Sequence, residues 1–179
     1  MPSLLEDPAG RRHPCARRRL RTLRRGAGVT TLRVESPVGP LFISEEGGAI
    51  TRVSWRGDGA GEETELLVEA RRQLRAYFDG TRQDFDLPLS VSGSAFQRQV
   101  CDAMAAIPFG ETRSYGDIAA ELGVPAQAVG QACGGNPIPV IIPCHRVLGA
   151  TNLGGFSGEG GVETKVALLR HEGAAGLLI

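Results

Sequence analysis

Cys144 and His145 stand side by side in the second half of the chain and form the residue pair best suited to chemistry. A free thiol has a pKa of about 8.5, so little of it is thiolate near neutral pH unless a base or cation lies close. Neighbouring side chains in an extended strand point to opposite faces, so this pair can cooperate only where the chain turns or a water bridges them. Taken alone, such a pair favours a buried structural cysteine beside a core histidine; a nucleophilic cysteine is the alternative, and the flanking sequence decides between them.

An apolar run leads into this pair. Val140, Ile141 and Ile142 are β-branched, which favours a short buried strand. Pro143 has no N–H and would end or edge that strand. We therefore expect Cys144 at the end of a buried element, where a site is rigid and still open to a substrate.

The sequences around the pair resemble the active-site signature of the O6-alkylguanine-DNA alkyltransferases, also called methylated-DNA–protein-cysteine methyltransferases. The matching segments are NPIP (136–139), IPCHRV (142–147), GFSG (155–158), IPFGETRSYGDIA (107–119) and the stretch ending in HEG (165–173). The resemblance extends loosely from about residue 30 and strongly from residue 94. It implies direct DNA repair by irreversible, single-turnover transfer of a methyl or other alkyl group from O6 of guanine to the protein's own cysteine, with no cofactor and no catalytic metal.

The resemblance implies a catalytic role for three residues. Cys144 matches the alkyl acceptor, His145 the base that deprotonates it through a water, and Glu172 the carboxylate that orients the imidazole. A base held by a third group is a general way to activate a weak nucleophile. Without the resemblance, Glu172 is equally typical of a solvated residue near a helix end.

Further residues would brace the site or bind guanine. By the resemblance, Asn136 braces the link between the DNA-binding helix and the active site, Tyr115 donates to a ring nitrogen, and Ser157 donates near O6. Carbonyl oxygens of Cys144 and Val147 would accept from the guanine amino group. Such donors stabilise charge that grows on the leaving purine. Taken alone, Tyr115 is also typical of a core aromatic, and Ser157 of a flexible Gly-rich loop.

Residues 115–122 and 126–133 predict two short helices joined by a three-residue turn, which is helix-turn-helix spacing. By the resemblance, the second helix binds double-stranded DNA in the minor groove beside a flipped base. The family's arginine that fills the gap left by this base corresponds here to Gln127. A neutral residue adds no counterion release, so the departure predicts weaker DNA capture. The other residues expected at DNA are Gly116, Ala126 and Arg113.

The expected fold class is α/β (α+β). The first half has the periodicity of strands at 30–35, 40–44, 49–55 and 85–91 and of an amphipathic helix at 62–78. The second half is mostly helical. We expect a support domain over residues 29–91, which the resemblance makes ribonuclease-H-like, and an alkyltransferase and DNA-binding domain over 94–175.

The composition indicates the cellular environment and the metal content to be expected. No run of the 179 residues approaches the ~20 apolar residues of a membrane span, and no secretory signal is present. Four cysteines without a CxxC pair suit a reducing cytoplasm, and His13 and Cys15 are too few for a zinc site in the first half. We expect a monomer. Lys165, the only lysine, is interpreted as a product of compositional bias.

Residues 1–28 carry eight arginines against Glu6 and Asp7, whereas the remainder has 12 basic and 18 acidic residues. We expect this Arg-rich segment to be a disordered extension, or the product of a start codon assigned too far upstream. A tail that follows DNA through its phosphates is the alternative.

Two other classes of function stay open. Alkyltransferase-like proteins bind alkylated DNA without accepting the group and have another residue at the cysteine position, so the presence of Cys144 argues against that class. An unrelated Cys-His acyltransferase or hydrolase would turn over small substrates and would need no residue like Tyr115.

Overall fold

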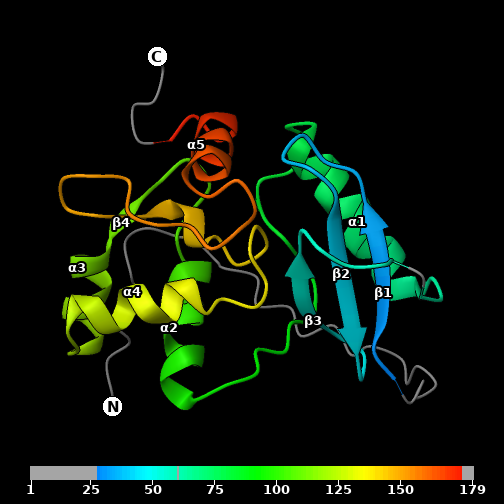
Figure 1. Ribbon diagram of the computed structural model, residues 1–179, viewed down its shortest axis with the longest axis horizontal. Coiled ribbons are helices and arrows are strands. Elements are labelled where there is room, and N and C mark those ends of the chain that lie inside the picture. Colours follow the sequence, from blue (N-terminus) through cyan, green and yellow to red (C-terminus); the bar gives the residue numbers. More distant parts are fainter. Residues whose placement is uncertain (1–27, 60, 175–179) are drawn as a thin grey trace, which may run out of the picture.

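The computed structural model describes residues 28–59 and 61–174, so the expectations for the Arg-rich arm, with His13 and Cys15, lie outside the described residues. Two parts lie side by side in Figure 1: a small sheet with one helix, and a group of helices around the segment that carries Cys144. The mixed α/β class expected from the sequence is confirmed.

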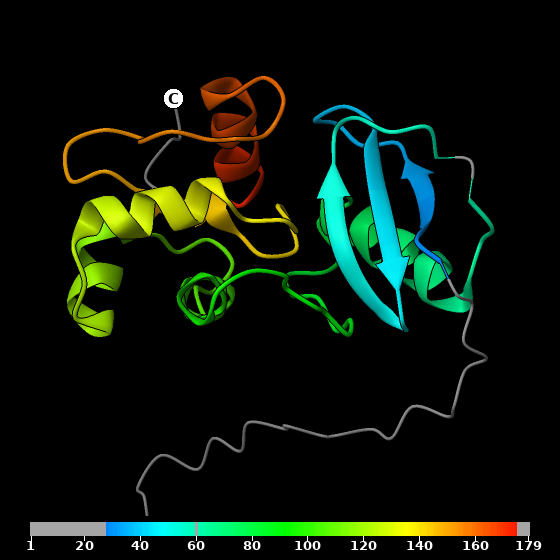
Figure 2. The same ribbon diagram turned by 60° about the horizontal axis from the view of Figure 1, so that its bottom comes forward.

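Three strands form an antiparallel meander with the middle strand central: β1 (Thr30–Val34), β2 (Leu41–Glu46) and β3 (Ala49–Ser54). Leu32 pairs with Ile43, and Ile43 with Val53, which places their apolar side chains on one face. Helix α1 (Glu65–Phe78) packs along the sheet (Figure 2) and buries its own apolar stripe there.

The strand expected at 85–91 is reduced to an isolated bridge between Ile50 and Leu89. The Gln73 amide holds the backbone of Asp86 instead: its Nε2 donates to the carbonyl at 3.0 Å, and its Oε1 accepts from the N–H at 2.8 Å. These backbone groups would be needed for a ladder of strand hydrogen bonds, so the pairing does not extend.

The second part contains α2 (Ala95–Ala105), α3 (Tyr115–Leu122), α4 (Ala126–Gly134) and α5 (Val162–His171). Ser94 and Ser114 cap α2 and α3, since each side chain accepts a backbone N–H of the first turn. Gly123 ends α3 with φ 66°, a conformation that glycine adopts without strain. α3 and α4 are therefore two packed helices with a tight turn between them, as the sequence predicts.

Two short strands tie this helix pair to the cysteine segment. β4 (Arg113–Ser114) pairs in parallel with β5 (Val147–Leu148). β5 follows directly after the 3-10 helix η1 (Cys144–Arg146). The beginning of α3 is thereby held next to the residues that follow Cys144.

The strand expected at Val140, Ile141 and Ile142 is wrong, although all three residues are buried. The chain makes a tight turn there, in which the Ile142 N–H donates to the carbonyl of Ile138 at 2.8 Å. Val140 has φ 73°, which is rare for a β-branched residue. Prolines on both sides remove backbone donors, so this run cannot continue a ladder.

One apolar core runs from the sheet into the helical part. At the outer edge of the sheet, the Val53 N–H donates to the Pro137 carbonyl at 2.9 Å, so the turn before Cys144 is fastened to β3. The domain boundary near residues 92–93 stays a prediction. Among the described residues, no helix is long and apolar enough to cross a membrane.

Candidate active site

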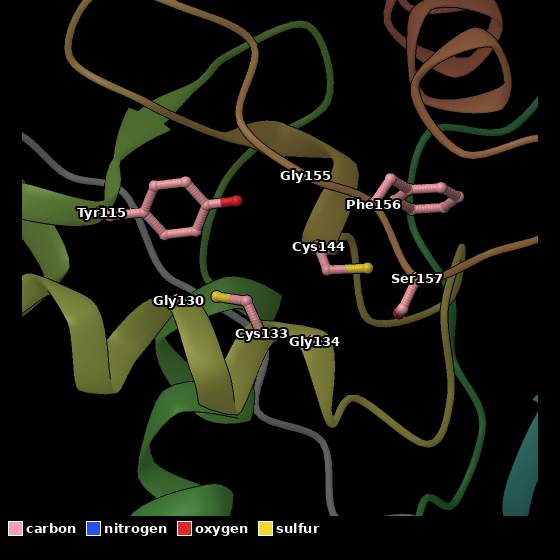
Figure 3. Close-up of a pocket in the computed structure, with 8 residues that line it drawn as sticks. All are labelled: Tyr115, Gly130, Cys133, Gly134, Cys144, Gly155, Phe156 and Ser157. Carbon is pink, nitrogen blue, oxygen red and sulfur yellow. The ribbon is translucent and has the colours of Figure 1, made fainter.

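Cys144 opens η1 and lines a cavity of about 420 Å³. The residue is only 5% exposed. Its sulfur points toward the side of the cavity where Ser157 lies, with the Tyr115 ring across from it (Figure 3). Further lining residues are Gly130, Cys133, Gly134, Gly155 and Phe156. A cavity of this size can hold a small organic group while shielding the thiol from bulk water.

His145 lies in the same helical turn as Cys144, so the opposite-face geometry of a strand does not apply. Its Nε2 is 2.7 Å from Glu172 Oε1, and neither side chain has exposed surface. A carboxylate only accepts, so Nε2 carries the proton and donates, which leaves Nδ1 as the basic nitrogen. Nδ1 is buried and has no hydrogen-bond partner within the described part of the chain. The imidazole is thus fixed in one tautomer with a free lone pair.

Glu172, at the end of α5, is the centre of a buried network. Arg146 donates to both of its oxygens, from Nε at 2.8 Å and from Nη2 at 3.0 Å. The Tyr77 hydroxyl donates to Oε1 at 2.6 Å, and the Gly110 N–H to Oε2 at 3.4 Å. The remaining Arg146 nitrogen, Nη1, donates to the Ile107 carbonyl at 2.5 Å.

Sequence reasoning missed Tyr77. It is fully buried in α1 of the first part, yet reaches the carboxylate of the last helix. The only signal in the sequence was a tyrosine on the apolar stripe of a helix, where a buried hydroxyl needs a partner. No feature of the sequence near Tyr77 identifies that partner.

The charges of this network set its proton affinities. Burial by itself would raise the pKa of Glu172, but hydrogen bonds from His145, Arg146 and Tyr77 lower it to about 2. Burial lowers the pKa of His145, against the attraction of Glu172. Arg146 is a permanent cation and compensates the carboxylate. His145 is therefore neutral at pH 7 and able to accept a proton.

Burial also raises the pKa of the Cys144 thiol, while a hydrogen bond with Asn136 and the charge of Lys165 oppose the shift. The resting thiol is therefore protonated, and its use as a nucleophile requires a base. Burial and the nearby Cys144 raise the pKa of Cys133 to about 12, so this second thiol of the cavity is also protonated at rest.

Lys165 corrects the interpretation of the only lysine as compositional bias. It has no exposed surface, and its Nζ donates to the carbonyls of Val147 at 2.6 Å and Gly155 at 3.1 Å. The ammonium also lies 5.9 Å from the centre of the Tyr115 ring. The signal in the sequence was its position three and four residues before Leu168 and Leu169, on the buried stripe of a helix.

Tyr115 is the first residue of α3, and its hydroxyl points into the cavity (Figure 3). Burial and the two cysteine thiols raise the pKa of Tyr115, so the phenol remains protonated and can donate. The loop residue Gly154 lies against it with φ 68°, and a Cβ there would come within 2.7 Å of the ring. Glycine allows the loop to close over Tyr115.

The first part of the chain holds the loop that carries Ser157. Phe156 packs edge-on against Trp55, with ring centres 5.9 Å apart. Arg56 Nε lies 3.5 Å from Glu159 on the other side of Ser157. This surface ion pair contributes little to stability, so the contact between Phe156 and Trp55 is the main interaction that holds the loop.

Asn136 braces the turn between α4 and Cys144. Its Oδ1 accepts from the Ile138 N–H at 3.0 Å, and its Nδ2 donates to the Ile142 carbonyl at 2.8 Å. The Cys144 carbonyl accepts the Val147 N–H, and the Val147 carbonyl accepts from the buried lysine. Each carbonyl has a second lone pair for a ligand.

The residues expected at DNA lie outside the lining of the thiol cavity. Gln127, Ala126 and Gly116 are exposed in the first turns of α4 and α3. Arg113 is paired with Glu121 at 2.7 Å, so its charge is partly compensated. This surface is less basic than the electrostatic footprint expected of a DNA binder.

Comparison with known proteins first defines the class. Two family models match this chain: the ribonuclease-like domain of 6-O-methylguanine DNA methyltransferase over residues 30–91, and the DNA binding domain of the same protein over residues 95–174. The chain belongs to the 6-O-methylguanine DNA methyltransferase family.

Individual relatives share most of their length with it. The constitutive methylated-DNA–protein-cysteine methyltransferase of Bacillus subtilis (strain 168) is 44% identical over 152 residues, which cover 77% of this chain and 92% of the relative. The crystal structure of the Mycobacterium tuberculosis O6-methylguanine methyltransferase gives a TM-score of 0.73 at 40% identity, covering 82% of this chain and 93% of that one. A structure of the M. tuberculosis protein in complex with DNA gives 0.73 at 41% identity, covering 80% and 92%.

Replacing Glu172 by glutamine keeps the shape and removes the charge. We expect a loss of about 3–5 kcal/mol in the free energy of unfolding at pH 7, because Arg146 is left buried without its counter-charge. The pKa of Glu172 is lowered on folding to about 2, so its charge stabilises the fold above the unfolded pKa of about 4.3, and this contribution is lost as the pH falls toward 2. Urea denaturation at several pH values measures both effects. The difference from wild type should shrink in acid; a constant difference, or an equal loss in the exposed control Glu163→Gln, would contradict the assignment.

Lys165→Met removes the buried ammonium with little change in length. The pKa of Cys144 should rise further, since the charge that opposes its upward shift is gone. The pH dependence of Cys144 alkylation by iodoacetamide, followed on the peptide by mass spectrometry, measures this change. Lys165→Arg keeps the charge and should return the profile toward wild type; identical profiles for all three proteins would rule out an electrostatic role.

Proposed function

We propose that this protein repairs DNA by transferring the alkyl group of O6-alkylguanine, typically methyl, to Cys144, once per molecule. The observation that carries this proposal is a buried thiol facing a cavity, next to a neutral histidine whose only free nitrogen has a lone pair available. Relatives at 40% identity and above are named as methyltransferases of methylated DNA that use a protein cysteine.

The reaction starts with proton transfer. His145 Nδ1 takes the Cys144 proton through a bridging water, and Glu172 stabilises the imidazolium that forms. The thiolate then attacks the alkyl carbon, so the S–C bond forms while the bond to O6 breaks and its electron pair goes to the purine. The product thioether has no group that water can displace, and each molecule therefore reacts once.

Donors around the cavity stabilise the leaving purine. Tyr115 donates to a ring nitrogen and Ser157 to O6, where negative charge grows during transfer. The carbonyls of Cys144 and Val147 accept from the exocyclic amino group. The raised pKa of Tyr115 supports its role as a donor.

DNA approaches along α4 in the minor groove, with the modified guanine flipped into the cavity. In support, Gly130 and Cys133 of α4 line the cavity while Gln127 on the same helix is exposed. A thiol this deeply buried cannot reach a base inside the stack. We propose a monomer in the cytoplasm, where the unpaired thiols found among the described residues persist.

Mass spectrometry of Cys144 tests the function directly. The full chain is mixed with a duplex oligonucleotide containing O6-methylguanine, digested, and analysed at the peptide level. We expect one methyl group on the peptide that bears Cys144 and none in Cys144→Ser. Labelling by the free base O6-benzylguanine, but not by DNA, would mean that the chemistry is intact and DNA capture fails. Labelling by neither would favour a binding protein, and turnover of small thioesters an unrelated thiol enzyme.

Gln127→Arg tests whether the neutral residue at this position of α4 weakens DNA binding. A cation at the exposed start of α4 should tighten binding to duplex DNA and steepen the slope of log affinity against log salt by about one unit. The rate with free O6-benzylguanine should stay unchanged, because Gln127 lies outside the cavity lining. Fluorescence anisotropy at several salt concentrations measures the slope. An unchanged slope would show that this position does not face DNA.

A further inference from the structure

A second cavity, of about 510 Å³, lies next to the thiol cavity. Residues 51–56 and Ser92 form one side, and residues of the turn and loop around Cys144, between 134–139 and 157–159, form the other. Gly134 and Ser157 line both cavities, so the two spaces meet at these residues.

Ser157 is the residue that links the two spaces. Cys144 Sγ points toward the side where Ser157 lies (Figure 3). A methyl group transferred to this sulfur stays within the first cavity. In the proposed function Ser157 donates to O6, so a longer substituent begins beside Ser157, which also lines the second cavity.

The walls of the second cavity carry both apolar and charged side chains. Pro137, Pro139 and Trp55 supply the apolar surface. The charged residues are Arg52, Arg56 and Glu159. Arg56 is paired with Glu159 at 3.5 Å, whereas Arg52 is exposed and has no ion pair among residues 28–59 and 61–174.

We propose that the second cavity receives the distal part of long guanine O6 substituents and favours those that end in a carboxylate on an apolar stem. The stem packs against the prolines and Trp55, and the carboxylate meets Arg52. The inference rests on the proposed function and deepens it. The bond changes are those of methyl transfer, and the carboxylate takes no part in them.

Matched substrates test the preference. Duplex oligonucleotides carry O6-(3-carboxypropyl)guanine or O6-(5-carboxypentyl)guanine, each compared with its terminal amide, and O6-methylguanine is the reference. The rate of transfer to Cys144 of the full chain is followed by mass spectrometry. At low salt we expect the carboxylate to react about fivefold faster than the amide at one or both lengths.

Three variants separate the cavity from general charge effects. Arg52→Gln should bring the ratio of carboxylate to amide rates close to one. Glu159→Gln should raise the ratio, because it removes a like charge and frees Arg56. Arg75→Gln changes an exposed arginine of α1 that lines neither cavity and should leave the ratio unchanged. Methyl transfer should be equal in all three.

The outcomes are distinguishable. Equal rates for carboxylate and amide at both lengths, with normal methyl transfer, would overturn this inference alone. If Arg52→Gln slows every oligonucleotide equally but not free O6-benzylguanine, Arg52 contacts DNA phosphates and the inference is wrong. Absence of methyl transfer in the wild type would overturn the proposed function and this inference with it.

Discussion

One buried carboxylate, that of Glu172, constrains the rest of the structure. A charge without exposed surface is costly unless it is paired and fully hydrogen-bonded. Its donors come from three separate segments: Tyr77 in α1, His145 and Arg146 in η1, and the Gly110 backbone. The carboxylate is satisfied only when both parts of the chain are docked, so the same contacts that complete the fold also orient the histidine.

The first part of the chain has more to do with the site than its sequence indicates. It supplies the Tyr77 hydroxyl to the carboxylate and packs Trp55 against the loop that carries Ser157. The edge of β3 also holds the turn before Cys144, through the bond from Val53 to Pro137. These contacts give the first part of the chain a direct influence on the geometry around Cys144, His145 and Ser157.

Two buried cations lie near the thiol, whereas the exposed start of α4 carries none. Arg146 and Lys165 are buried, one against the carboxylate and the other between carbonyls near the cysteine. The exposed start of α4 has Gln127 and no charge, and Arg113 is paired with Glu121. Under the proposed function, the charge of Lys165 therefore opposes the raised pKa of Cys144, whereas the proposed DNA-binding surface adds little counterion release.

Local patterns in the sequence were enough for the α/β class and for the helix pair of α3 and α4, since periodicity and turn residues act within a few residues. The family resemblance also pointed to His145 and Glu172, whose side chains the structure brings within 2.7 Å of each other. Val140 has a positive φ in a tight turn between two prolines, so the β-branched run gave the wrong prediction. Tyr77 and Lys165 were recognised only in the tertiary structure. Their partners lie 95 and 18 residues away along the chain, and the need of a buried hydroxyl or ammonium for a partner does not reveal which residue supplies it.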